Sequence, residues 1–280
     1  MTRATRIPFF FVAFVAFVVF VVLVSSRFTV ALQLVSVADE ITIGRQTQAE
    51  TRKRTPEVGD SSVRAYVTKI GARLGQSARG ERYPYSFSVA DYKEINAFAL
   101  PGGPIWVNRG AIQAAGTESQ LAGILAHEVA HVAQRHAAQQ LSNMIVTNMG
   151  MALFSALLGN TGAAMAANIA ARFVAGGTFL KFSRDDEDEA DRVGAEIMAR
   201  AGWDPRGMID LLETVREQEK RDPSSVEVFF SNHPAAKDRI ALLEGVVPAQ
   251  RAGKSDSAEF QAMRARLRRL PPAKSMTTKK

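Results

Sequence analysis

The chain has 280 residues, 46% of them hydrophobic, which is enough to bury one good-sized core. It has no cysteine, which excludes disulfides, thiolate metal sites and a cysteine-linked lipid anchor. The net charge is +7, but no nucleic-acid-binding motif accompanies it, so we do not expect nucleic acid as a partner. We predict that residues 246–280 form a basic tail that is flexible or meets an anionic membrane surface. Its basic residues include Arg264, Arg266, Arg268, Arg269, Lys274, Lys279 and Lys280.

The N-terminal segment has the pattern of a targeting sequence. Arg3 and Arg6 precede an uninterrupted apolar run over residues 9–24, about the minimum length for a bilayer-spanning helix. Positive residues before an apolar block predict insertion into a membrane or export across it. Small residues at positions 24–26 and 36–38 suit signal peptidase, so cleavage and retention both stay open. We interpret residues 1–38 as a signal peptide or an N-terminal membrane anchor.

The next part of the chain is predicted to mix helices with a little sheet. Asp60 precedes a helical pattern that places four apolar residues on one face, Val63, Val67, Ile70 and Leu74. Residues 85–89 alternate as a strand, Gly102 and Gly103 mark a turn, and residues 105–107 read as a second strand. The fold class predicted is therefore α+β and predominantly helical.

A metal-binding pattern follows. Residues 127–131 read His-Glu-Val-Ala-His, and the chain has only four histidines. Positions i and i+4 of a helix share one face, so His127 and His131 can reach a single cation. Glu128 can lean toward the same site, where it is placed to act as a base toward a metal-bound water. Zinc-dependent peptide hydrolysis uses this arrangement.

The context of this motif predicts a strong helix. Thr117 and Gln120 form a capping box, and apolar residues then recur at helical spacing, Leu121, Ile124, Leu125 and Val132. Neither proline nor glycine interrupts residues 124–149. The alternative interpretation is a core helix with two incidental histidines, and a third metal ligand would decide against it.

A long apolar stretch, residues 144–182, comes after the motif and contains glycines within 159–162 and at 176–177. A transmembrane hairpin is poorly supported, because each half is short and Asn148, Asn168 and Arg172 interrupt the apolar surface. We favour a helical hairpin that covers the cleft, and we leave open whether it also touches the membrane.

The acidic run within residues 183–194 offers the third ligand. A catalytic zinc takes three protein ligands, and without cysteine the third must be His, Glu or Asp. Glu187 and Asp191 are four residues apart and share a helix face. One carboxylate could bind zinc while the other accepts a hydrogen bond from a histidine ligand. The alternative is an acidic, solvated first helical turn after Ser183.

With these motifs the chain resembles the M48 family of zinc metallopeptidases, which are gluzincins. The resemblance covers residues 39–245. It rests on the His-Glu-x-x-His motif, on Glu-x-Glu-x-Asp at residues 187–191, and on three further segments, residues 95–103, 134–136 and 232–239. It implies a zincin-like domain whose small sheet carries a substrate-aligning edge strand. It also implies one Zn²⁺ per chain.

The resemblance assigns roles to particular residues. His127, His131 and Glu187 would bind zinc, and Asp191 would hold a histidine ligand, with Arg239 in the same supporting group. Glu128 would activate the water. His233 would approach the metal, either to stabilise the oxyanion or to occupy the open zinc position at rest. Asn96 and the strand Ile105, Trp106 and Val107 would bind an extended substrate.

Family members act on unfolded or misassembled membrane and envelope proteins, so the resemblance implies protein quality control. It also implies an exported protein of the bacterial periplasm, anchored to or associated with the inner membrane. Membrane association would run through the N-terminal segment, with residues 144–182 as a second candidate. The alternative function is a zinc-binding chaperone or adaptor that binds unfolded segments without cleaving them. The presence of Glu128 argues against it.

Overall fold

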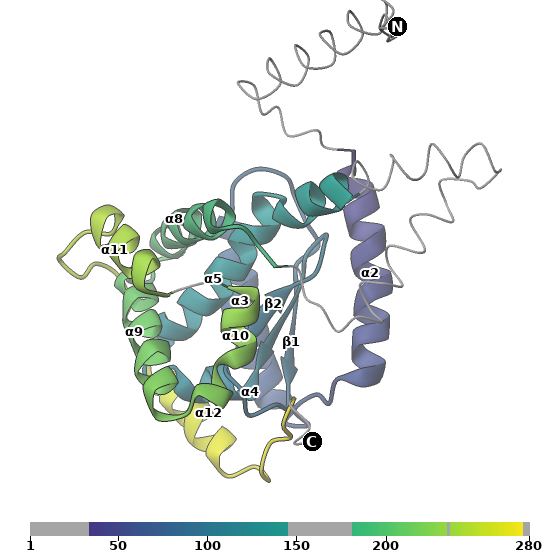
Figure 1. Cartoon of the computed structure of the whole chain (residues 1–280). Coiled ribbons are helices and arrows are strands. Elements are labelled where there is room, and N and C mark those ends of the chain that lie inside the picture. Colours follow the sequence, from purple (N-terminus) through teal and green to yellow (C-terminus); the bar gives the residue numbers. More distant parts are fainter. Residues whose placement is uncertain (1–33, 145–180, 234–235, 277–280) are drawn as a thin grey trace, which may run out of the picture. The chain divides into compact units, whose positions relative to one another are not determined.

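The computed structural model describes residues 34–144, 181–233 and 236–276. The N-terminal apolar segment and most of the apolar stretch 144–182 lie outside these residues. Figure 1 shows the arrangement of the elements. The helices and strands are α2 (Val37–Arg54), α3 (Ser61–Ser77), β1 (Ser86–Ala90), β2 (Ala97–Ala99), β3 (Pro104–Asn108), α4 (Arg109–Ala114), α5 (Glu118–Ala133), α8 (Arg184–Arg200), α9 (Arg206–Arg221), η1 (Pro223–Ser225), α10 (Glu227–Asn232), α11 (Ala236–Val246) and α12 (Ala258–Arg268).

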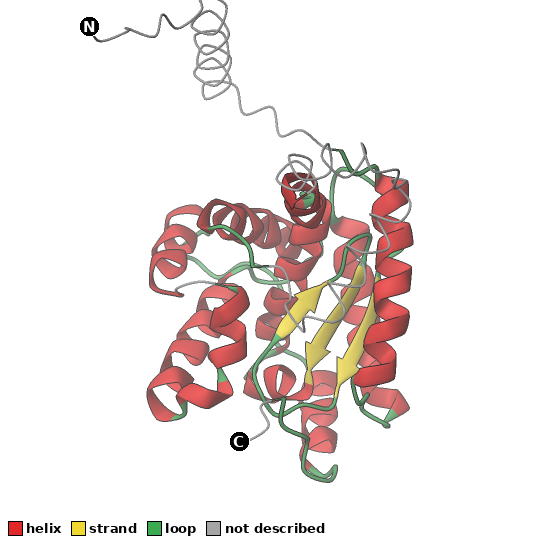
Figure 2. Cartoon of the chain, turned by 45° about the vertical axis from the view of Figure 1, so that its right-hand side comes forward, coloured by secondary structure: helices red, strands yellow, loops and turns green. Residues whose placement is uncertain are grey.

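The predicted fold class is confirmed, since helices predominate and the strands form one small mixed sheet of order β1-β3-β2. β1 runs parallel to β3, and β2 runs antiparallel to it. The helix α2 lies along one face of the sheet, and α3 and α5 lie on the other (Figures 1 and 2). Gln48 and Arg52 of α2 donate hydrogen bonds to Ser86 and Ser88 of β1, which fixes α2 on that face.

The edge strand differs from the one expected. Residues 105–107 belong to β3, which is the central strand and is buried along its whole length. Both of its edges are already paired, with Trp106 opposite Ser88 on one side and opposite Phe98 on the other. Ile105, Trp106 and Val107 therefore cannot align a substrate through their backbone. A continuous apolar run is typical of a strand buried on both faces. Among the described strands, β1 and the three-residue β2 form the edges.

The helix α5 runs through the main core, where α3, α8 and α9 pack against it. Its start is the predicted one, because Thr117 accepts from the Gln120 amide while the Gln120 side chain accepts from the Thr117 amide. Asp60 likewise caps α3, as the sequence indicated. Every residue from Glu118 to Val132 is buried, so α5 has no solvent face.

The C-terminal region corrects a second expectation. We define residues 250–276 as the C-terminal strap, because they are folded against the domain rather than extended as a flexible tail. Within the strap α12 buries three apolar residues at helical spacing, Phe260, Met263 and Leu267. Further along, the Arg109 guanidinium donates to the carbonyl oxygens of Leu267, Leu270 and Pro271. The many basic residues obscured this apolar face in the sequence.

Two further findings concern where the folded unit begins and whether its helices could span a membrane. The folded unit begins at Leu34, a few residues before the expected boundary, and Ser36 caps α2 in a capping box with Asp39. Among the helices within the described ranges, none is both long and apolar enough to cross a bilayer.

Candidate metal centre

His127 and His131 lie one turn apart on the buried helix α5, and their imidazoles point to one place. The two Nε2 atoms are 2.9 Å apart. On the far side of the first ring, Nδ1 of His127 lies 3.0 Å from Oδ1 of Asp191. A carboxylate can only accept, so in the neutral imidazole this contact places the His127 proton on Nδ1 and leaves the Nε2 lone pair facing the second histidine. Such a lone pair is available to a cation.

The helix α8 brings Glu187 to the same place. Ser183 starts this helix with a capping box to Asp186, and Glu187 is buried in its first turn. Its Oε2 atom lies 3.4 Å from Nε2 of His127, and Oε1 lies 3.4 Å from Nε2 of His131. The sequence could not choose between Glu187 and Asp191, and the structure places Glu187 among the histidine nitrogens.

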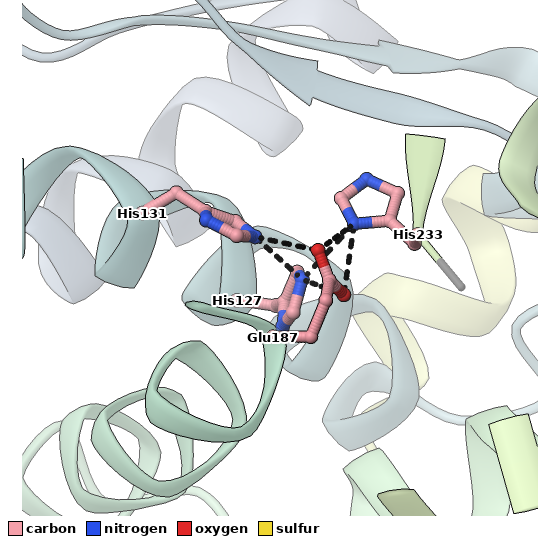
Figure 3. A group of neighbouring side chains, drawn as sticks. All are labelled: His127, His131, Glu187 and His233. Atoms are coloured by element: carbon pink, nitrogen blue, oxygen red, sulfur yellow. Dashed lines mark hydrogen bonds and ion pairs between the residues drawn. The ribbon is translucent and has the colours of Figure 1, made fainter. Parts of the chain in front are cut away.

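His233 completes the group (Figure 3). It follows α10 with an extended backbone, as expected for a residue before Pro234, and its ring is buried. One ligand atom from each of His127, His131, Glu187 and His233 lies within 4.8 Å of the others, and all four residues are buried. Two nitrogens and one carboxylate oxygen are the donor set of a catalytic zinc, so these residues fit one metal ion.

Asp191 and Arg239 support this group from behind. The Arg239 guanidinium donates from Nε to Oδ2 and from Nη2 to Oδ1 of Asp191, both at 2.7 Å. A third nitrogen, Nη1, lies 2.9 Å from Oε2 of Glu187. Burial raises the pKa of Asp191, but the charge and hydrogen bonds of Arg239, together with the contact with His127, outweigh burial and lower the pKa to about 2. Asp191 is therefore an anion that can hold the His127 N–H.

Glu128 points into the same buried region but is not one of the grouped ligands. Its Oε1 atom lies 3.5 Å from Nε2 of His233. Its Oε2 atom is buried and has no hydrogen-bond partner within the part of the chain that the structure describes. Burial raises the pKa of Glu128 above its ordinary value. A buried carboxylate with one free oxygen is suited to exchange a proton with a small molecule beside it.

The predicted substrate-binding residues divide into two groups. Asn96 is fully buried just before β2, and neither polar atom of its side-chain amide has a hydrogen-bond partner among the described residues. Ile105, Trp106 and Val107 cannot pair with a substrate through their backbone, because β1 and β2 already occupy both edges of β3. The strand β2, in contrast, has one edge that does not pair with β3. The backbone carbonyl of Asn96 accepts from the backbone N–H of Asn108, and the backbone N–H of Leu100 donates to the carbonyl oxygen of Pro104. Residues alternate along an antiparallel strand, so Ala97 and Ala99 turn their backbone N–H and C=O groups away from β3.

Sequence reasoning missed two side chains at the site. Phe182 stacks on His131, with ring centroids 3.9 Å apart and the planes inclined by 17°. It directly precedes the Ser183 cap, and no periodic pattern marked it. The other is His136, whose Nδ1 atom lies 2.8 Å from Nδ1 of His131. Its signal was present, since it belongs to the segment 134–136 that carries part of the family resemblance, but the sequence assigned it no role.

Comparison with known proteins agrees with this geometry. The model of peptidase family M48 matches residues 61–247, which hold every residue of the metal centre. The beta-barrel assembly-enhancing protease of Escherichia coli O157:H7 is 32% identical over 76% of this chain and 45% of its own length. The mitochondrial metalloendopeptidase OMA1 of Schizosaccharomyces pombe is 33% identical over 65% of this chain and 52% of its own. The metalloprotease LoiP of Escherichia coli is 26% identical over 67% of this chain and 71% of its own.

The chain spans about half the length of the first two of these relatives. The family match covers well over half of this chain, and it includes both histidines and the glutamate that converge in the structure. The chain therefore belongs to peptidase family M48, a family of metallopeptidases.

Proposed function

We propose that this protein is a zinc-dependent endopeptidase that cleaves unfolded or misassembled membrane and envelope proteins. The observation that carries the proposal is the position of Glu128. Its partly unpaired carboxylate is buried next to a group of four metal-binding side chains. A purely structural metal site would not require such a carboxylate beside its ligands.

His127, His131 and Glu187 would hold the zinc ion. When bound, zinc lowers the pKa of a water molecule and polarises the scissile carbonyl. The remaining work falls to the side chains of the chain itself. Asp191 keeps the Nδ1 proton on His127 and so directs Nε2 inward, and Arg239 holds both Asp191 and Glu187 in place.

Glu128 would accept a proton from the attacking water and then deliver it to the leaving amine. Its raised pKa supports this role, because a carboxylate that binds a proton more readily can both take it up and give it back. Burial also keeps bulk water from competing for that proton.

The backbone of β2 would bind the substrate. Ala97 and Ala99 present N–H and C=O groups away from β3, so an extended peptide can add to the sheet there. Pairing through the backbone selects little for sequence, but it requires an extended segment. Folded proteins rarely offer one, which favours unfolded or misassembled substrates.

The names of the relatives and the N-terminal segment bear on the cellular role and location. One relative is named for enhancing beta-barrel assembly and another is named as mitochondrial. Together with the apolar N-terminal segment, the first name supports an exported protein of the bacterial periplasm that is anchored to, or associated with, the inner membrane. Quality control of envelope proteins would suit that place.

The test is cleavage of a chemically unfolded protein by the purified chain, with and without a metal chelator. We expect cleavage that the chelator abolishes and that added zinc restores. Glu128→Gln keeps the shape of the side chain and removes the base, so it should lower turnover by at least about 10²–10⁴-fold while zinc stays bound.

Cleavage measured beside binding of the unfolded protein separates the proposed enzyme from a non-cleaving chaperone, and metal analysis of the same samples shows whether zinc stays bound. A chaperone would bind the unfolded protein without cleaving it, with Glu128 intact or replaced. Cleavage at the wild-type rate by Glu128→Gln would show that the base is another group.

A further inference from the structure

His136 is the one histidine of the chain that lies outside the four-residue metal group, yet it is buried and touches that group. Its Nδ1 atom lies 2.8 Å from Nδ1 of His131. Its Nε2 atom lies 3.3 Å from Oε2 of Glu189 and 3.9 Å from Oδ1 of Asp186. Both ring nitrogens thus face polar atoms, one inside the site and one toward solvent, where the Glu189 side chain is 53% exposed.

The direction of these hydrogen bonds follows from metal binding. His131 points Nε2 at the metal group, so a metal there leaves the imidazole proton on Nδ1. This N–H must donate to His136, whose Nδ1 then carries a lone pair and whose proton sits on Nε2. That second N–H points at Glu189, which can accept it. Each atom in this chain of contacts has only one consistent role.

The two histidine ligands are therefore supported in parallel ways. His127 donates from Nδ1 to Asp191, an anion held by Arg239. Among the described residues no carboxylate lies at Nδ1 of His131, and His136 takes the corresponding place. His136 accepts at one ring nitrogen and donates to the Glu189 carboxylate at the other. Through this ring the carboxylate can help to orient His131 and to raise its basicity as a ligand.

The backbone is shaped to bring His136 back to the metal helix. Helix α5 ends at Ala133, and Arg135 then adopts a left-handed conformation with φ of 62°. Such a conformation costs roughly 1–2 kcal/mol in a residue other than glycine. Contacts hold it in place, because Arg135 donates from Nε to Oε1 of Glu40 and from Nη2 to the carbonyl oxygen of Val35, both at 2.7 Å.

Packing restricts the two rings further. Phe182 stacks on His131 and also meets His136, with ring centroids 5.9 Å apart. The rings of His131 and His136 are themselves inclined by 73°. An ordinary core histidine needs no such alignment with a metal ligand.

We propose that His136 is a positioning residue of the metal centre. It accepts a hydrogen bond from Nδ1–H of His131 and so keeps Nε2 of that ligand directed at the metal, while Glu189 orients His136 from the surface. This inference rests on the proposed metal centre, and it adds a residue that the ligand motif does not contain.

The test compares His136→Asn with His136→Leu. The asparagine Oδ1 atom can take the place of Nδ1 as an acceptor, whereas leucine fills similar space without one. We expect the leucine variant to bind zinc about 10–100-fold more weakly and the asparagine variant to stay close to wild type. With Co²⁺ in place of zinc, the visible absorption bands should shift in the leucine variant only. Thermal unfolding of the chelator-treated proteins shows whether packing was altered.

The outcomes separate the possible failures. Wild-type zinc affinity and cobalt bands in His136→Leu would overturn the proposal, and so would equal losses in both variants, which would point to packing. If wild type itself took up no metal, the proposed function would fail instead.

A measurement without substitution at His136 covers the case in which the leucine variant does not fold. Nitrogen-15 NMR of the zinc-loaded Glu128→Gln protein reports which ring nitrogen carries each proton. We expect the proton on Nδ1 of His131 and on Nε2 of His136. A proton on Nδ1 of His136 would overturn the assignment.

Discussion

Nδ1 of His233 lies 2.9 Å from Oε1 of Glu187, inside the group of atoms that would bind the metal. The same nitrogen is 3.3 Å from Nε2 of His127, and the opposite ring nitrogen is 3.5 Å from Oε1 of Glu128. The imidazole of His233 therefore contacts both the proposed metal ligands and the proposed base Glu128. A side chain that donates to the oxyanion would have to leave the space beside the metal open to the substrate. This arrangement favours the resting-state plug over the oxyanion donor.

Replacing His233 by alanine tests the two roles. As a plug, its removal should raise the basal rate of cleavage of an unfolded protein, because water and substrate gain access to the fourth position. As an oxyanion donor, its removal should lower turnover by about 10²–10³-fold with little change in zinc content. Initial rates and zinc content measured on the same preparation distinguish the two. An unchanged rate would leave His233 with a structural role only.

Glu187→Ala should weaken zinc binding more than alanine at any other acid of the same helical turn. Glu187 is buried among the histidine nitrogens, whereas Asp188 is only half-buried and its side chain makes no hydrogen bond or ion pair with a described residue. Asp188→Ala is therefore the matched control. Asp191→Ala should fall between them, with a loss of about 10–100-fold, because it supports a ligand without being one. Zinc retained after dialysis gives the ranking, and equal retention in the Glu187 and Asp188 variants would move the ligand role elsewhere.

Much of this site could be predicted from the sequence because its signals are local. The i, i+4 spacing of His127 and His131 needs only a helix, and the capping box at Thr117 marks where that helix begins. The choice of Glu187 over Asp191 came from the resemblance, since both residues share a face of α8. The packing of α8 against α5 decides which carboxylate takes which place. It brings Glu187 to Nε2 of His127, on the metal side of the ring, and Asp191 to Nδ1 on the opposite side.

The features that could not be predicted depend on contacts between distant parts of the chain. β2 is only three residues long, too short for an alternating pattern, and it is a strand because β3 pairs with it. The C-terminal strap looked flexible because its charge hid an apolar face that matters only once α3 and α4 are beside it. His136 was visible in the sequence, but its contact with His131 depends on the left-handed Arg135.

The edge of β2 predicts the effect of a proline. Proline lacks an N–H, and a sheet tolerates it only where the N–H faces outward at an edge. Ala99→Pro should therefore leave the pairing with β3 in place and remove one hydrogen bond to the substrate. We expect a lower kcat/KM, mostly through KM, with zinc content and thermal stability retained. Ala99→Ser keeps the N–H and is the control. If both variants cleave unfolded protein equally well, the substrate does not pair with β2.

Glu118 links the start of the metal helix to the C-terminal strap. It is buried at the first position of α5, and four side chains donate to its carboxylate, namely Tyr66, Trp203, Lys254 and Ser257. Two of the donors, Lys254 and Ser257, belong to the strap. Burial raises the pKa of Glu118, but these hydrogen bonds outweigh burial, and the net pKa lies below its ordinary value.

The sign of the resulting pH dependence follows from the lowered pKa. A carboxylate that is more acidic when folded stabilises the folded state above its unfolded pKa of about 4.3, and this contribution disappears as the pH falls through the lower folded value. Glu118→Gln removes it, so the variant should be about 1–3 kcal/mol less stable than wild type near neutral pH, with the difference shrinking in acid. Urea unfolding of both chelator-treated proteins across this pH range measures it, since chelation removes metal release as a competing cause. Glu259→Gln is the control, because Glu259 is an exposed carboxylate of α12 that pairs with Lys69 at the surface. A constant difference between wild type and Glu118→Gln at every pH would mean that the Glu118 network acts through its shape and not its charge.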